Sequence, residues 1–441
     1  MLFKEGFIFY KKNTYMSIED IYSIYIQHPV ISTDTRNIQK NSIFFCLKGQ
    51  SFNGNTFASE ALTKGAAFVV MDEQAYAVND KCIVVDNTLK TLQELALHHR
   101  QQLGIPFIGI TGTNGKTTTK ELIKTVLSQK YTVLATQGNL NNHIGVPLTI
   151  LSINNMVEIA VIEMGANHAG EIDDLCKIAL PDYGIITNIG KAHLEGFLNI
   201  ETIIETKTAL YKAVKNVDGT IFINMDDKLL MSNADTINKI TYGTTESADY
   251  YGKVISDGFL CKVFLPKTLT TISTQLTGDY NFSNIMAAVA VGQYFNISIP
   301  TIQQAITSYQ PSNSRSQILQ KGNNIFIMDA YNANPSSMKP AIINFANIEH
   351  ENKALILGDM KELGNESLTE HQQIVDLLIT LSFKQVFLIG PEFSKTKHPQ
   401  GWSIETWDEA LHIISHKNIQ QAMILVKGSR SMQMERILSL Y

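Results

Sequence analysis

Residues 107–120 read FIGITGTNGKTTTK, an apolar run followed at once by a glycine-containing turn and a helix-forming segment. A loop between a buried strand and a helix can wrap a phosphate with backbone N–H groups at the helix N-terminus. Gly115, Lys116 and Thr117 match the end of the phosphate-loop pattern G-x-x-x-x-G-K-[ST], but position 110 is isoleucine where that pattern has glycine. The stretch therefore predicts a nucleotide-phosphate loop with altered spacing. An ordinary glycine turn before a helix is the alternative.

Outward from this stretch, short apolar runs alternate with segments of helical spacing. The runs that we expect to be strands are 42–47, 66–71, 81–86, 107–111, 158–164, 183–189, 219–225, 324–330, 353–360, 384–390 and 421–428. Helices are expected over 87–103, 116–129 and 283–295. Continuously apolar strands that alternate with helices favour parallel sheets covered on both faces.

Two breaks divide this α/β pattern into three domains. Gly104 and Pro106 end the helix over 87–103, and the polar, proline-containing segment 310–317 interrupts the second series of strands. We predict a small α/β domain over 1–103, a central domain with a mainly parallel sheet over 104–313, and a doubly wound, Rossmann-like domain over 314–441.

The overall composition excludes several classes of protein. The chain has 441 residues, of which 44% are apolar and 17% charged, with a formal net charge of −5. This is globular composition and gives no sign of a nucleic-acid binder. The four cysteines are scattered and are expected to be reduced thiols. The N-terminal 15 residues do not resemble a leader, Met16 is an alternative start, and no run approaches ~20 apolar residues, so we expect a cytoplasmic protein without membrane insertion.

Several side chains around the loop are candidates for phosphate and metal chemistry. Lys116 supplies a cation for phosphate, and the hydroxyl of Thr117 can bind Mg²⁺. Glu163 ends an apolar run, where the metal-facing acid of a nucleotide enzyme is expected, although an acid at a strand end is more often only solvated. His193 follows the run 183–189, although a single loop histidine is more often structural.

A series of motifs, in order over more than 300 residues, resembles the Mur ligase family of cell-wall synthesis. The motifs are TGTNGKTTT, VIEMGANHAGEI, TNIGKAHLEGF, LTGDYNFSNIMAA, DAYNANPSSM, LGDMKELGNES and VKGSRSMQMERI. The segment ISTDTRNIQKNSIFFCLKGQSFNGNTF is similar to the domain of this family that binds a UDP-linked substrate. YNANPSSM and GDMKELG are similar to the members that join D-alanyl-D-alanine to UDP-N-acetylmuramoyl-tripeptide.

This resemblance implies an ATP-dependent amide ligase. ATP phosphorylates the C-terminal carboxylate of the tripeptide, the amine of D-alanyl-D-alanine attacks the acyl phosphate, and a tetrahedral intermediate gives the amide, ADP and phosphate. The implied domains are a UDP-binding module, a central P-loop ATPase domain, and a Rossmann-like domain that binds D-alanyl-D-alanine and closes on ATP.

The resemblance also implies roles for individual residues. Lys116, Glu163, His193 and Lys207 are the implied catalytic set, with Mg²⁺ held by Thr117, Glu163, His193 and a carbamylated Lys207. The implied nucleotide contacts are Gly112, Thr113, Asn114, Gly115, Lys116, Thr117, Thr118, Asn284, Arg315 and Asp329. The implied substrate contacts are Thr35, Arg36, Asn141, Asn142, Asn332 and Asn334.

Three alternatives stay open at this point. Another ligase of the same superfamily, such as folylpolyglutamate synthase or an earlier-acting Mur ligase, shares the phosphate loop. A P-loop switch or motor would turn over ATP without an amino acceptor, and an inactive scaffold would not turn over ATP at all. The third residue of the tripeptide, diaminopimelate or lysine, is equally open. We expect a monomer, because the lobes of a three-domain ligase must move.

Overall fold

A computed structural model describes residues 16–255, 259–312 and 314–441. The N-terminal 15 residues, in which we expect no leader, and Asn313, at the second expected domain boundary, lie outside these described residues. The chain separates into two compact units. The first takes the described chain up to Gly104 together with Gln137–Asn154 and Lys177–Ala179, and the second takes Ile105–Thr136, Asn155–Cys176 and Leu180–Tyr441.

The first unit is built on a parallel sheet with strand order β1-β2-β5-β6. Its strands are β1 (Ile31–Ser32), β2 (Ile43–Phe45), β5 (Phe68–Met71) and β6 (Cys82–Val84), with a separate hairpin of β3 (Lys48–Gly49) and β4 (Phe52–Asn53). Its helices are α1 (Ile18–Gln27), α2 (Ala58–Thr63), α3 (Thr88–Gln102) and α5 (Gly145–Leu151). α3 packs on α5 as well as on α1, and so joins the segment Gln137–Asn154 to this unit.

The centre of the second unit is a parallel sheet with strand order β13-β12-β11-β10-β7-β9-β8. Its strands are β7 (Phe107–Thr111), β8 (Val133–Ala135), β9 (Ile159–Glu163), β10 (Tyr183–Ile186), β11 (Thr220–Asn224), β12 (Asn238–Gly243) and β13 (Tyr250–Tyr251). The helices along this part of the chain are α4 (Lys116–Leu127), α6 (Glu171–Ala179), α7 (Leu194–Phe197), α8 (Ile200–Asn216), α9 (Lys228–Ser232), α10 (Phe282–Tyr294) and α11 (Ile299–Ser308). α4 and α10 pack together over one face of the sheet in a core of apolar residues. The expected parallel sheet is therefore confirmed.

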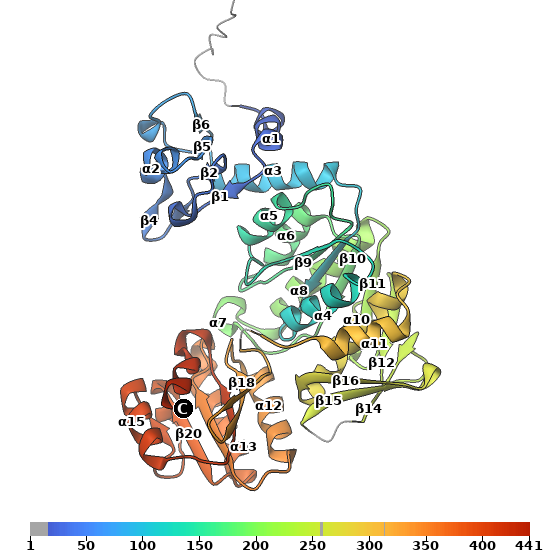
Figure 1. Cartoon of the computed structure of the whole chain (residues 1–441), viewed down its shortest axis with the longest axis vertical. Coiled ribbons are helices and arrows are strands. Elements are labelled where there is room, and N and C mark those ends of the chain that lie inside the picture. The colour runs from blue at the N-terminus through green and yellow to red at the C-terminus, as the bar shows by residue number, and fades with distance from the viewer. Residues whose placement is uncertain (1–15, 256–258, 313) are drawn as a thin grey trace, which may run out of the picture. The chain divides into compact units, whose positions relative to one another are not determined.

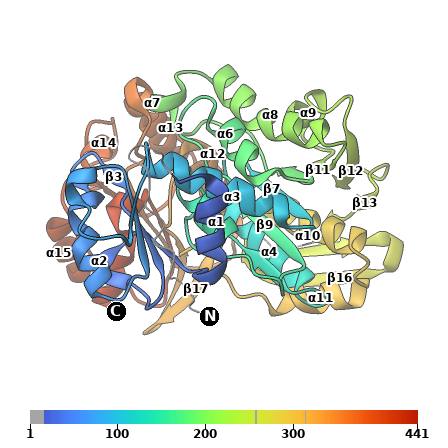
Figure 2. The same cartoon turned by 90° about the horizontal axis from the view of Figure 1, so that it is seen from above.

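An antiparallel sheet within this unit was not predicted from the sequence. β14 (Lys253–Val254), β15 (Leu260–Leu265) and β16 (Thr270–Thr277) pair in that order. β16 buries alternate residues, and α11 packs against it (Figure 2). Because β16 is rich in threonine and only one face is buried, its strand pattern is weak in the sequence.

The C-terminal part of the second unit contains a sheet with strand order β17-β18-β22-β19-β20-β21. Its strands are β17 (Gln317–Lys321), β18 (Asn324–Asp329), β19 (Lys353–Gly358), β20 (Gln385–Ile389), β21 (Ser403–Ile404) and β22 (Met423–Lys427), and only β17 pairs antiparallel. α12 (Pro335–Asn347) and α13 (Ser367–Thr380) lie on one side of the sheet and α15 (Trp407–Lys417) on the other, with α14 (Pro391–Ser394) after β20 (Figure 1). This doubly wound arrangement confirms the expected α/β class.

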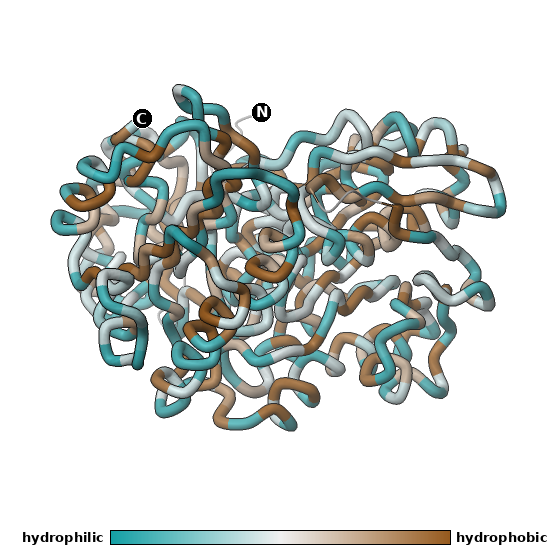
Figure 3. Tube along the Cα trace, turned by 90° about the horizontal axis from the view of Figure 1, so that it is seen from below, coloured by the Kyte–Doolittle hydropathy of each residue, from teal (hydrophilic) through white to brown (hydrophobic). Residues whose placement is uncertain are grey.

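Hydrophobic and hydrophilic stretches alternate along the trace in Figure 3, as strands and helices joined by polar loops require. Within the described residues, no helix combines the length and the apolar character that a membrane span needs.

Candidate active site

The phosphate loop lies between β7 and α4, as predicted, and two glycines give it its shape. Gly112 has φ 143° and Gly115 has φ 79°, values that side-chain-bearing residues rarely adopt. A Cβ atom on Gly112 would lie 2.0 Å from Thr187 Oγ1, and one on Gly115 would lie 2.6 Å from Asn284 Oδ1. Both positions therefore require glycine for space as well as for backbone conformation.

Two residues after β10 hold the loop in place. The Thr187 hydroxyl donates to Asn114 O at 2.6 Å, and Asn188 Oδ1 accepts the Asn114 N–H at 3.0 Å. The Thr113 N–H donates to Asn188 O at 2.9 Å, and its hydroxyl accepts the Gly190 N–H at 2.9 Å. Sequence reasoning missed Thr187 and Asn188, although both stand in the motif TNIGKAHLEGF.

Lys116 and Thr117 open helix α4 and point toward different groups. Lys116 Nζ donates to Gly112 O at 2.7 Å and to Thr113 O at 3.2 Å. Burial lowers the pKa of Lys116, and the carboxylate of Glu163 opposes this shift. Thr117 Oγ1 donates to Glu163 Oε2 at 2.9 Å, and Glu163 is only 1% exposed at the end of β9. Thr118 follows on the first turn of the same helix.

Lys207 lies on α8 and contacts the phosphate loop. It is 3% exposed, and its Nζ donates to Gly112 O at 3.3 Å. Burial, with a smaller contribution from the charge of Lys116, lowers the pKa of Lys207 to about 7. An amine with this pKa is substantially unprotonated near neutrality, which an ordinary surface lysine is not.

His193 precedes α7 with a left-handed backbone, φ 52°. Its Nδ1 contacts the carboxylate of Glu362, which follows β19, and hydrogen bonding to His193 lowers the pKa of Glu362. Sequence reasoning missed Glu362, which stands in the motif GDMKELG. Within the described ranges, no three His, Cys, Asp or Glu residues gather as a metal-binding group.

The predicted nucleotide contacts outside the loop are engaged with other protein groups. Asn284 Oδ1 accepts from Thr119 Oγ1 at 3.0 Å, and its Nδ2 donates to Asn281 Oδ1 at 2.9 Å, so this side chain supports the loop at Gly115. The Arg315 guanidinium stacks 3.6 Å from the ring centroid of Tyr331.

Asp329, at the end of β18, forms an ion pair with a buried lysine. Its Oδ2 lies 2.5 Å from Nζ of Lys427, which ends β22 and is 2% exposed. Lys427 was not predicted, although it stands in the motif VKGSRSMQMERI. The parallel pairing of β18 and β22 brings the two residues side by side.

The predicted acceptor asparagines shape the loop before α12. Asn332 Oδ1 accepts the Ala333 N–H at 2.9 Å. Asn334 caps α12 through a reciprocal pair with Ser337, and its Nδ2 donates to Asn114 Oδ1 in the phosphate loop at 2.9 Å. This contact joins the acceptor loop directly to the nucleotide loop.

The predicted substrate contacts of the first unit lie in two polar turns. Arg36 forms a bidentate pair with Asp34, with Nη2 2.6 Å from Oδ2, and lowers the pKa of that carboxyl to about 2. The carbonyl of Thr35 accepts from Lys64 Nζ at 2.9 Å. In the second turn, which also contains Asn141, the side chain of Asn142 accepts the N–H of Gly145, the first residue of α5, at 2.9 Å.

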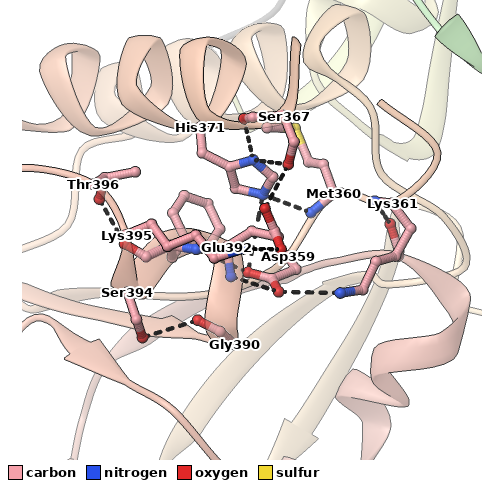
Figure 4. Close-up of polar contacts among 12 residues, drawn as sticks. Asp359, Met360, Lys361, Ser367, His371, Gly390, Glu392, Ser394, Lys395 and Thr396 are labelled. Carbon is pink, nitrogen blue, oxygen red and sulfur yellow. Dashed lines mark hydrogen bonds and ion pairs between the residues drawn. The ribbon is translucent and has the colours of Figure 1, made fainter. Parts of the chain in front are cut away.

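The GDMKELG motif takes part in a buried polar cluster centred on Asp359, the second residue of the motif (Figure 4). Asp359 is 0% exposed, and its carboxylate accepts the N–H groups of Glu392 and Phe393, each at 3.1 Å, and the Lys361 ammonium at 3.2 Å. The ring of His371 accepts the Met360 N–H at 3.0 Å on Nε2. This cluster fixes the loop after β19, and with it the backbone that leads to Glu362.

Comparison with known proteins gives the family. Residues 29–108 match the Mur ligase family catalytic domain, residues 110–292 the Mur ligase middle domain, and residues 314–430 the Mur ligase glutamate ligase domain. The chain is 36% identical over 421 residues to the UDP-N-acetylmuramoyl-tripeptide–D-alanyl-D-alanine ligase of Bacillus subtilis, covering 92% of each chain. The chain belongs to the Mur ligase family.

Two further relatives place the Mur ligase fold over nearly the whole chain. The UDP-N-acetylmuramoyl-tripeptide–D-alanyl-D-alanine ligase of Escherichia coli is 30% identical and covers 92% of each chain. The crystal structure of MurF ligase from Thermotoga maritima in complex with ADP is similar with a TM-score of 0.82 at 27% identity, covering 94% of this chain and 97% of that one. The resemblance to the Mur ligase family that the motifs indicated is thereby confirmed.

Proposed function

We propose that this Mur ligase joins D-alanyl-D-alanine to UDP-N-acetylmuramoyl-tripeptide with hydrolysis of ATP to ADP and phosphate, giving the pentapeptide precursor of peptidoglycan. The relatives whose names state this activity match almost the whole chain, and the Thermotoga relative binds ADP. The observation that carries the proposal is the phosphate loop, which Gly112 and Gly115 shape, and its hydrogen bond to Asn334 in the loop that precedes α12. We place the reaction in the cytoplasm and expect a monomer.

The residues around the loop fit a magnesium ion. The Thr117 hydroxyl and the Glu163 carboxylate lie 2.9 Å apart, and both are the hard oxygen donors that Mg²⁺ prefers. Magnesium usually takes one or two carboxylates and completes its shell with water and substrate phosphates. Thr117 and Glu163 would therefore hold a first ion, which would neutralise charge on the phosphates when bound.

The chain itself supplies the second requirement of the reaction, a cation close to the phosphates. A carboxylate that attacks a γ-phosphate approaches against like charge, and fixed positive groups lower that barrier. Lys116, tied by its ammonium to the carbonyls of Gly112 and Thr113, is held within the loop where the phosphates would bind. The backbone N–H groups at the start of α4 add to the positive field.

Lys207 is suited to carry a carbamate. Carbamate formation requires the neutral amine, and the burial that lowers the pKa of Lys207 to about 7 provides it. The carbamate would replace a buried positive charge by an anion. Together with His193, it would hold a second magnesium ion. The pairing of His193 Nδ1 with Glu362 leaves Nε2 as the ring nitrogen available to a metal.

The remaining predicted residues are assigned to the three substrates. Asn284, Arg315 and Asp329 are proposed for the nucleotide, with Asp329 held by Lys427. Asn332 and Asn334 are proposed for the dipeptide. Thr35, Arg36, Asn141 and Asn142 are proposed for the UDP-muramoyl peptide. We propose that residues 1–103 form the UDP-muramoyl-binding domain, residues 104–313 the ATP-binding domain, and residues 314–441 a domain that binds D-alanyl-D-alanine and closes on ATP.

The proposal is tested by omitting one substrate at a time. ADP release is measured with ATP and Mg²⁺ in the presence of both UDP-muramoyl-tripeptide and D-alanyl-D-alanine, and then with either one left out. We expect turnover only with both. Full turnover without the dipeptide would favour the switch or motor alternative. Comparing tripeptides that end in diaminopimelate and in lysine then defines the third residue.

A further inference from the structure

A lysine ammonium lies fully buried one turn beyond the phosphate loop. Lys120 is 0% exposed, and its Nζ donates to Thr136 O at 2.5 Å and pairs with the Glu121 carboxylate at 2.8 Å. Burying an ammonium is costly, and a buried ion pair is often no more stable than well-packed apolar residues in its place. The reaction proposed above gives this charge no role.

The acceptor of that ammonium, Thr136, is the residue at which the chain leaves the central sheet. Its backbone N–H donates to Val161 O at 3.0 Å and so continues the pairing of β8 with β9. Its hydroxyl oxygen accepts the backbone N–H of Glu163 at 2.9 Å, so that a side chain continues the contact with β9 where the backbone pairing of β8 ends. Thr136 and Glu163 are each 1% exposed, so this hydrogen bond is shielded from water.

The contacts therefore form a chain that begins and ends on helix α4. Lys120 holds Thr136, Thr136 holds the backbone of Glu163, and the Glu163 carboxylate reaches the Thr117 hydroxyl at 2.9 Å. Thr117 and Lys120 are three residues apart and therefore lie on the same face of the helix. Because these groups are close-packed, a shift of Thr136 is transmitted to Glu163.

We propose that Lys120 is a positioning residue for the magnesium site, which fixes the end of β8 and through it the carboxylate of Glu163. This inference rests on the proposed function, since that function makes Glu163 and Thr117 the magnesium ligands. Groups that hold a metal ligand from behind typically change metal affinity by about 10–100-fold when they are removed.

The test measures ADP affinity of the full chain by titration calorimetry, once with Mg²⁺ and once with EDTA. The ratio of the two affinities is the magnesium enhancement. For Lys120→Met we expect this ratio to fall by about tenfold or more, with the affinity in EDTA unchanged. Lys124→Met, the same substitution one turn further along α4, is the matched control and is expected to keep the wild-type ratio. An equal loss with and without Mg²⁺ in Lys120→Met would show a merely structural role and overturn the proposal.

A second pair of variants tests the link between Thr136 and Glu163, on which the proposal depends, even if Lys120→Met does not fold. Thr136→Val removes the hydroxyl that holds Glu163, and Thr136→Ser retains it. We expect the valine variant to lose magnesium enhancement and the serine variant to keep most of it. A wild-type ratio in Thr136→Val would contradict the proposed chain of contacts.

Glu163→Gln separates this inference from the proposed function. If Glu163→Gln loses the magnesium enhancement while Lys120→Met and Thr136→Val keep it, the magnesium site stands and the role of Lys120 is wrong. If Glu163→Gln itself keeps the wild-type ratio, the proposed magnesium site is wrong, and the role of Lys120 falls with it.

Discussion

Replacing Gly112 by alanine tests the geometry of the phosphate loop most sharply. The added Cβ would lie 2.0 Å from Thr187 Oγ1 and 3.0 Å from Thr187 N. Thr187 has little freedom to move away, because its N–H donates to Thr111 O at 3.0 Å and extends the pairing of β10 with β7. The loop, rather than the strand, must therefore shift.

The magnitude follows from two separate costs. Overpacking against a fixed neighbour typically costs about 1–3 kcal/mol. Holding alanine at φ 143° adds about 1–3 kcal/mol of backbone strain. Together they amount to about 2–6 kcal/mol, and because 1.4 kcal/mol corresponds to a tenfold change in affinity, ADP binding should weaken by at least about thirtyfold.

The assay compares ADP affinity and urea unfolding in three variants. Gly112→Ala should lose ADP affinity, and adding Thr187→Ala should restore part of it by removing the hydroxyl that the new Cβ meets. Gly322→Ala is the control for backbone strain alone, since its φ is 55° and an added Cβ would meet nothing within 4 Å. It should cost about 1 kcal/mol of stability and leave ADP binding unchanged. Wild-type ADP affinity in Gly112→Ala would refute this account of the loop.

Three further predictions concern buried charged and polar groups. Lys207→Ala should lose ligase activity and regain part of it with formate, a small carboxylate that replaces the carbamate. Unchanged activity without formate would remove the carbamate from the mechanism. Asp359→Asn should lower the free energy of unfolding by about 3 kcal/mol, because a neutral amide would replace the carboxylate that accepts from buried N–H donors. A urea midpoint equal to that of the wild type would contradict this. Burial lowers the pKa of His371 below its ordinary value of 6.5. The unfolded chain therefore binds a proton that the native state resists, so stability should fall as the pH drops below about 6.5, and His371→Gln should flatten that slope in urea unfolding.

Much of the fold was predictable because its strands are continuously apolar. The runs that became β7, β9, β10, β18, β19 and β22 stand out in the sequence, and helix α4 follows directly from the Gly-Lys-Thr segment. The sheet of β14, β15 and β16 was missed. β16 reads TTISTQLT, with Ile272 and Leu276 as its two apolar residues and Thr274 also on the buried face, and this half-buried pattern resembles a polar loop.

The candidate site was predictable only where its residues lie close together in the sequence. Gly112, Gly115, Lys116 and Thr117 come from one stretch, whereas Thr187 reaches Gly112 only because β10 pairs with β7 in the register Ile186 to Thr111. The support of Glu163 by Thr136 likewise depends on the pairing of β8 with β9. Strand order and register are long-range properties that local motifs do not contain.

As an amide ligase, the chain activates the peptide carboxylate as an acyl phosphate under the function proposed above. An isotope-transfer experiment tests this with UDP-muramoyl-tripeptide labelled with ¹⁸O in both oxygens of the terminal carboxylate, together with ATP, Mg²⁺ and D-alanyl-D-alanine. One labelled oxygen attacks the γ-phosphorus and leaves with it when the amine displaces phosphate, so the inorganic phosphate should carry one ¹⁸O per amide formed. Inorganic phosphate without ¹⁸O would mean that water, and not the carboxylate, attacks ATP, and would contradict the account.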